Sequence, residues 1–85
     1  MAVILKYQLA VGDQLVPMHA GAQVLCVQSQ HQIITLWAAT NTTRPAVSRH
    51  FVVIGTGQTI TPGDLYIGTC QTSGGDLVWH VFERP

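Results

Sequence analysis

The chain contains 85 residues, of which 9% are charged and 47% are hydrophobic. Its four Lys and Arg residues balance its four Asp and Glu residues, so it lacks the basic excess of a protein that binds a nucleic-acid polymer through its phosphates. Its apolar runs are the length of strands and fall far below the roughly 18 residues of a membrane-spanning helix. These features argue against a nucleic-acid binder and a helical membrane protein, and they predict one domain over residues 1–85.

Apolar residues recur at every second position or in short runs, and the breaks between them are rich in Gly, Pro, Asp and Thr. This pattern is typical of β-strands. The N-terminal stretch has no basic region ahead of its apolar residues, so a strand is expected there and not a signal peptide. Pro17 predicts an edge position for the second strand, because proline cannot donate to a neighbouring strand. In chain order, the expected strands are 3–9, 14–18, 22–30, 32–40, 49–57, 65–71 and 77–83.

The segments between the strands carry turn signals. The stretch 73–76 (Ser-Gly-Gly-Asp) is typical of a hairpin turn, since both glycines tolerate positive φ. The stretch 61–64 (Thr-Pro-Gly-Asp) favours one helical turn, with Thr61 as its cap and Pro62 at the first helical position. Residues 41–47 are expected to form a loop. The sequence therefore predicts an all-β fold, a compact antiparallel barrel or sandwich of about seven short strands.

The low charge predicts self-association. Soluble domains usually contain about 25% charged residues, and a small chain has a large surface to cover. Several strands are apolar on both faces. In the last one, Leu77, Trp79 and Val81 alternate with residues that are apolar too, except for His80. One small domain can cover both faces of its central strands only, and a net charge near zero does not oppose association. A homo-oligomer is expected.

No motif for catalysis or metal binding is present. The four histidines are not spaced i, i+2 or i, i+4, and Cys26 and Cys70 lie apart from them, so no zinc site is predicted. The cysteines are expected to be buried, reduced thiols. The serines lack a nucleophile-elbow context, and four acids are few for a pair of catalytic carboxylates. We therefore expect that the protein is not an enzyme and that it needs no cofactor. His80, in an apolar strand, is either a core histidine with one hydrogen bond or a ligand contact.

A short pattern, I-G-T-x-Q, occurs twice, at residues 54–58 and 67–71. Glycine inside a strand usually marks a bulge or a close approach of another backbone. The two segments are therefore expected to bend at matching places.

The best candidate for ligand contact is segment 40–49, which holds half of the basic residues, four hydroxyls and the only Asn. Arginine offers a planar fork for phosphate or carboxylate. Trp37, just before this segment, and Trp79 and Tyr7 elsewhere, could provide a stacking surface for a base. The alternative is a solvated loop whose arginines serve solubility and whose aromatic neighbours belong to the core. The candidate ligand-binding residues are Trp37, Thr42, Thr43, Arg44, Ser48, Arg49 and His80.

Seven short segments form an ordered set over nearly the whole chain. They are Lys6-Tyr7-x-Leu9, Gly21-Ala22-x-x-Leu25-x-Val27-Gln28, Leu36-Trp37-Ala38, Arg49-x-Phe51, Gly55-Thr56-Gly57, Tyr66-Ile67-Gly68-Thr69 and Gly75-x-Leu77-Val78-Trp79-His80-Val81-Phe82-Glu83. This set resembles a family of short, functionally unassigned proteins encoded by tailed bacteriophages and prophages, and the closing G-x-L-V-x-H-V-F-E is its most specific part. The chain departs from the family around Cys26 and residues 28–32. The resemblance implies no activity, only a viral gene that acts in the host bacterial cytoplasm or in the virion.

Two functional hypotheses are compatible with these features. The first is a phage-encoded, non-enzymatic homo-oligomer that sequesters a small anionic ligand between its subunits, such as a nucleotide immune signal of the host. The second is a small structural or accessory phage protein that acts through protein–protein contacts, in which Arg44 and Arg49 would be replaceable.

Overall fold

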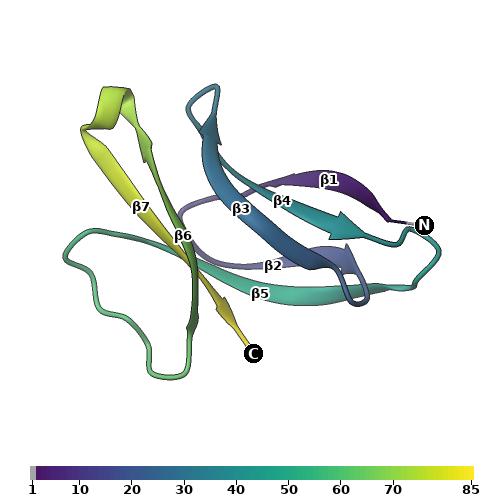
Figure 1. Cartoon of the computed structure of the whole chain (residues 1–85). Coiled ribbons are helices and arrows are strands. Elements are labelled where there is room, and N and C mark those ends of the chain that lie inside the picture. The colour runs from purple at the N-terminus through teal and green to yellow at the C-terminus, as the bar shows by residue number, and fades with distance from the viewer. Residues whose placement is uncertain (1) are drawn as a thin grey trace.

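The alternating apolar pattern forms antiparallel strands throughout the chain (Figure 1). The structure, a computed structural model, describes residues 2–85. Its elements are β1 (Val3–Gln8), β2 (Gly12–His19), β3 (Gln23–Gln30), β4 (Ile33–Thr40), β5 (Ala46–Gly55), β6 (Leu65–Thr72), the 3-10 turn η1 (Ser73–Gly75) and β7 (Leu77–Arg84). Within residues 2–85, no helix combines the length and the apolar character needed to cross a bilayer.

The strands form two sheets, one with the order β1-β4-β3 and one with the order β2-β5-β7-β6. All pairings are antiparallel. The predicted all-β fold is confirmed, and of the two architectures left open the structure has the sandwich. Pro17 lies in β2, at an edge of the larger sheet, as predicted. β5 begins at Ala46, inside the predicted loop, because Ala46 and Val47 pair with β2.

The core lies between the two sheets, where every second residue of the inner strands is directed. Leu36 and Ala38 of β4 face Phe51, Val53 and Val81 of the other sheet, and all five side chains are almost fully buried. Because side chains two positions apart share one face of a strand, burying these residues directs their neighbours outward. The residues that alternate with the buried ones therefore form the outer faces of both sheets.

The repeated I-G-T-x-Q pattern marks a bulge at one of its two positions. The register of β6 against β7 shifts between Tyr66 and Gly68. A Cβ atom at Gly68 would lie 3.3 Å from Cβ of Val27 in β3, so glycine allows the two sheets to approach each other closely here. Gly55, the matching glycine, ends β5 beside the ring of Trp79 and has no register shift. The expected matching bends are therefore found only in part.

The segment predicted as a helical turn is a tight turn instead. The amide of Asp64 donates to the carbonyl of Thr61 (3.1 Å), and Gly63 has a φ of +92°. Pro62 at the second position followed by a residue of positive φ defines a type II turn, and the conformation of Gly63 prevents a helical continuation. The segment 73–76 does connect β6 and β7 as predicted, with positive φ at both glycines.

Candidate functional site

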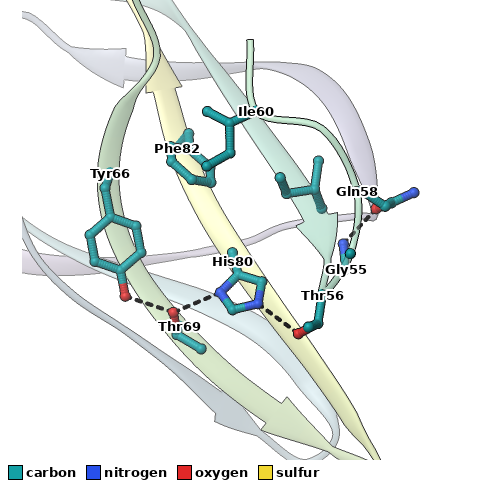
Figure 2. A pocket seen from close by; sticks show the side chains of 10 residues that line it. Gly55, Thr56, Gln58, Ile60, Tyr66, Thr69, His80 and Phe82 are labelled. Carbon is teal, nitrogen blue, oxygen red and sulfur yellow. Dashed lines mark hydrogen bonds between the residues drawn. The ribbon is translucent and has the colours of Figure 1, made fainter. Parts of the chain in front are cut away.

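A hollow lies on the outer face of the larger sheet, between strands β5, β6 and β7 and the segment that joins β5 to β6 (Figure 2). Its volume is about 450 Å³. This size falls in the range of about 300–1,000 Å³ that is typical of small-molecule sites. The lining residues are Ile54, Gly55, Thr56, Gly57, Gln58, Ile60, Tyr66, Thr69, His80 and Phe82.

Strand register brings the floor of the hollow together. His80 of β7 pairs with Ile54 of β5 on one side and with Thr69 of β6 on the other. Phe82, two residues further along β7, shares the face of His80 and pairs with Tyr66. The rings of Tyr66 and Phe82 lie edge to face, with centroids 5.6 Å apart. The floor is therefore a row of polar side chains beside a row of aromatic ones.

The segment 56–64 forms one wall of the hollow and is fixed at both ends. At its start, the side chain of Gln58 accepts a hydrogen bond from the amide of Gly55 (2.5 Å). At its end, the carboxylate of Asp64 accepts two hydrogen bonds from Arg84 (2.9 and 3.0 Å). These hydrogen bonds lower the pKa of the Asp64 carboxyl below its ordinary value. Ile60 extends from this segment over Phe82 (Figure 2).

A chain of hydrogen bonds crosses the floor (Figure 2). The Tyr66 hydroxyl lies 2.6 Å from Oγ1 of Thr69, which lies 3.0 Å from Nδ1 of His80. On the far side, Nε2 of His80 lies 2.8 Å from Oγ1 of Thr56. A neutral imidazole has one donor and one acceptor nitrogen, and a hydroxyl can fill either role. Both His80 nitrogens are therefore satisfied in either tautomer, and the exposed hydroxyls can reorient toward a ligand.

The hollow is apolar with neutral polar groups, since none of its lining residues is Lys, Arg, Asp or Glu. Thr56 and His80 form a hydroxyl–imidazole pair, as the nucleophile and base of a hydrolytic triad do. The second nitrogen of His80, however, faces the Thr69 hydroxyl and not a carboxylate, which in a triad stabilises the imidazolium. The hollow thus presents an apolar surface with neutral hydrogen-bonding groups.

The structure does not bring the seven predicted ligand-binding residues together. His80 alone lines the hollow. Trp37 lies on the outer face of the smaller sheet, where its neighbours are Lys6 and Cys26. The remaining residues lie at the start of β5 or in the β4–β5 loop, namely Thr42, Thr43, Arg44, Ser48 and Arg49.

Arg49 is engaged within the fold. Its guanidinium donates to both carboxylate oxygens of Glu83 (2.6 and 2.8 Å) and to the carbonyl of Ala22 (2.5 Å). The contact joins β5 and β7 to the segment before β3 and thus connects the two sheets. The hydrogen bonds to Glu83 raise the pKa of Arg49 above its ordinary value, against the opposing effect of burial. Arg49 therefore connects the sheets and has no free fork for a ligand.

The two other predicted aromatic residues pack against the core. Trp79 directs its indole N–H to Oγ1 of Thr72 (3.0 Å), and Tyr7 packs on the buried cluster between the sheets. Neither of them lines the hollow beside His80.

Sequence reasoning missed most of the groups around His80. Thr56, Thr69 and Tyr66 were not among the predicted ligand-binding residues, although they form the hydrogen-bond chain. One signal was present. Thr56 and Thr69 are the equivalent threonines of the two I-G-T-x-Q segments, and the fold places one on each side of the same imidazole. The repeated pattern thus contributes both hydroxyl partners of His80.

Among residues 2–85, no group of three or more His, Cys, Asp and Glu side chains has the arrangement of a metal site.

A family model described as "Domain of unknown function (DUF7352)" matches residues 1–85. No curated protein and no solved structure shows a significant match to the chain. The function must therefore be inferred from the geometry of the hollow.

Proposed function

Since the chain belongs to the DUF7352 family of unknown function, we propose from its geometry that it is a non-enzymatic protein that captures a small nucleotide. The base of the nucleotide would occupy the hollow beside His80. The observation that carries this proposal is the hydrogen-bond chain through His80, which runs beside the aromatic pair of Tyr66 and Phe82.

The aromatic pair offers one ring to a ligand. Phe82 is 6% exposed and forms the base of the hollow, whereas Tyr66 is 62% exposed. Stacking of a base on an exposed aromatic ring contributes about 1–3 kcal/mol. The Tyr66 ring is held at the hollow by its hydroxyl bond to Thr69, so little conformational freedom is lost on binding.

The polar groups provide recognition of the ring edge. A heterocycle such as a nucleobase has both donors and acceptors on its edge, and the hydroxyl–imidazole chain can match either type of group. A purely hydrocarbon ligand would leave these groups without new partners. The neutral lining therefore supports a heterocycle over a lipid-like ligand.

We also propose that the binding protein is a homo-oligomer. Only 9% of the residues are charged, and large apolar side chains such as Ile4 and Leu15 are 64% and 67% exposed. Exposed apolar groups on a chain without net charge favour association. Burying them between copies would shield them from water.

The resemblance to tailed-phage and prophage proteins supports a role in the host. On that basis the nucleotide would be an immune signal made by the infected bacterium, and the protein would sequester it in the host cytoplasm. Sequestration needs tight binding and no chemical step, in keeping with the uncharged surroundings of His80.

A structural or accessory phage protein is the second candidate. The observation that favours it is the outer face of the smaller sheet, which Trp37 shares with the exposed Ile4 and Ile33. Such a face suits a protein partner. Quantitative mass spectrometry of purified virions separates the two functions, since an abundant copy in the particle is expected only for the accessory protein.

Isothermal titration calorimetry tests the proposed function. We expect the intact oligomer to bind at least one of the four ribonucleosides or their linear and cyclic monophosphates at micromolar concentration. His80→Ala should weaken that binding at least tenfold. His31→Asn is the matched control, because His31 lies exposed in a turn with a φ of 51° that Asn tolerates. Absence of binding by the wild-type oligomer to all of these compounds would refute the proposal.

A further inference from the structure

We infer that Arg44 of a second copy completes the hollow by placing its guanidinium against the anionic part of the ligand. This inference rests on the proposed function. A nucleotide carries at least one negative charge, and the hollow of a single copy has no cationic side chain among its lining residues. The missing charge must then be contributed from outside the hollow.

Among residues 2–85, Arg44 is the basic residue whose side chain makes no hydrogen bond or ion pair. Arg49 and Arg84 are each held in ion pairs. The amine of Lys6 donates to the side chain of Gln30 (2.7 Å). For Arg44, the interactions within residues 2–85 involve its backbone groups alone, and its side chain is exposed. Its guanidinium is thus available to a ligand.

The loop that carries Arg44 is ordered by its own hydrogen bonds. The side chain of Asn41 accepts from both the amide (3.0 Å) and the hydroxyl (2.7 Å) of Thr43, and the amide of Arg44 donates to the Asn41 carbonyl (3.0 Å). Nδ1 of His19 donates to the Arg44 carbonyl (2.7 Å). The backbone is therefore fixed while the guanidinium remains free. Such preorganisation lowers the entropy lost when the side chain binds.

Arg44 cannot reach the hollow of its own subunit. It precedes Ala46 at the start of β5, whereas His80 pairs with Ile54 near the end of that strand. Eight residues of antiparallel strand span about 27 Å, far beyond the length of an arginine side chain. The two ends of β5 thus hold the two complementary parts of the site, and they meet only across an interface between copies.

A twofold dimer satisfies this requirement twice. In an isologous interface, each contact from the first copy to the second is matched by the reverse contact. Two larger sheets packed with β5 running in opposite directions would bring each Arg44 to the other copy's His80. The exposed Leu15 on this outer face (67% exposed) would lie between the two sites and contribute apolar contact area.

The first test compares nucleosides with nucleotides. Affinities of the four ribonucleosides and their 5′-monophosphates are measured by isothermal titration calorimetry. We expect the wild-type protein to bind a monophosphate at least tenfold more tightly than its nucleoside. Arg44→Gln should reduce that ratio to below about threefold. Lys6→Gln, which removes the same charge from the other sheet, should retain the wild-type ratio.

The second test identifies which copy contributes Arg44. Subunits with Arg44→Gln are mixed with subunits with His80→Ala, after native mass spectrometry has confirmed that mixed dimers form. Each variant alone lacks high-affinity sites for the 5′-monophosphate. A mixed dimer regains one intact site, because one subunit keeps His80 and the other keeps Arg44. Random pairing should therefore restore roughly one quarter of the sites.

Each outcome is decisive. Restored sites in the mixture support the inference. Mixed dimers without restored sites, or an unchanged phosphate preference in Arg44→Gln, overturn it and leave the proposed function standing, provided that the wild-type protein binds a nucleoside. Should the wild-type protein bind neither nucleosides nor monophosphates, the proposed function fails and the inference fails with it.

Discussion

Two regions of the molecule use polar side chains in opposite ways. Between the sheets, Arg49 and Glu83 form an ion pair whose two side chains are 21% and 20% exposed. On the outer face, the chain through His80 consists of neutral groups at the surface. Charge thus fixes the fold where water is largely excluded, whereas neutral hydroxyls and an imidazole are presented to solvent. Within one copy, the charges of Arg49 and Glu83 hold the two sheets together, and the hollow offers shape and neutral hydrogen bonds to a ligand.

This division separates stability from binding. A half-buried ion pair resists opening because a lone charge left in its place would be poorly solvated. Exposed hydroxyls exchange partners with water at little cost, and therefore with a ligand as well. The two regions should respond differently to substitution, since loss of the ion pair affects unfolding and loss of the neutral groups affects affinity.

The largest expected effect is on stability. Arg49→Met removes the guanidinium and leaves the Glu83 carboxylate and the Ala22 carbonyl without their partner. We expect the free energy of unfolding, measured by urea denaturation, to fall by about 2–3 kcal/mol. Lys6→Met is the control and should change stability by less than about 0.5 kcal/mol, as is usual for exposed positions. Nucleoside affinity of the folded Arg49→Met protein should match the wild type, and a large loss of affinity would contradict the separation.

The sequence predicted the strands well, because their alternation reflects burial on one face. It also predicted the edge position of Pro17 from the missing amide donor. The turn at 61–64 was predicted wrongly, since proline in second place suits both a helix start and a type II turn. The positive φ of Gly63 decides between them, and a glycine in the sequence does not reveal the sign of its φ.

The candidate site was much less predictable. Arg49 was grouped with the ligand-binding residues because its partner Glu83 lies 34 positions away. Thr56 and Thr69 were visible as a repeated pattern, but their convergence on His80 depends on the register of β7 between β5 and β6. Register and long-range ion pairs arise from tertiary packing, which local patterns do not encode.

The next effect concerns the stacking ring. Tyr66→Ala removes a 62% exposed side chain, so unfolding should change little. Nucleoside affinity should fall about 10- to 100-fold, the loss expected for one base–aromatic stack. Tyr66→Phe keeps the ring and should bind within about threefold of the wild type, since only one exposed hydroxyl bond is lost. Equal losses for both variants would show that the hydroxyl, and not stacking, dominates.

A smaller effect is expected from the hydroxyls beside His80. Thr56→Val preserves shape and removes the partner of the imidazole Nε2. A neutral hydrogen bond contributes about 1 kcal/mol, so nucleoside affinity should fall about fivefold in calorimetry, with no change in the urea midpoint. Thr42→Val, in the β4–β5 loop, is the matched control and should bind nucleosides as the wild type does. A loss of stability in Thr56→Val would mean that the neutral chain also holds the fold.

The smallest expected effect is on stability, at Asp64, where an ion pair holds one side of the hollow. Asp64 is charged, yet it fixes the segment that forms a wall of the neutral hollow, through its hydrogen bonds with Arg84. These bonds lower the pKa of the Asp64 carboxyl in the folded state. A lowered pKa means that the folded state favours the carboxylate. The resulting stabilisation is present above the unfolded pKa of about 3.9 and is lost as the pH falls through the lower, folded value.

Asp64→Asn should therefore lower the urea midpoint slightly at pH 7, because the amide oxygen still accepts a hydrogen bond from Arg84 and Arg84 keeps its ion pair with Asp13. The difference from the wild type should shrink as the pH falls below about 4. It should disappear in stronger acid, where the wild-type carboxyl is protonated and is uncharged like the amide. Urea midpoints measured from pH 7 to pH 2.5 give this profile. A difference that stays constant over the whole range would show that the amide disturbs the segment by its shape, and that charge plays no part in holding this wall of the hollow.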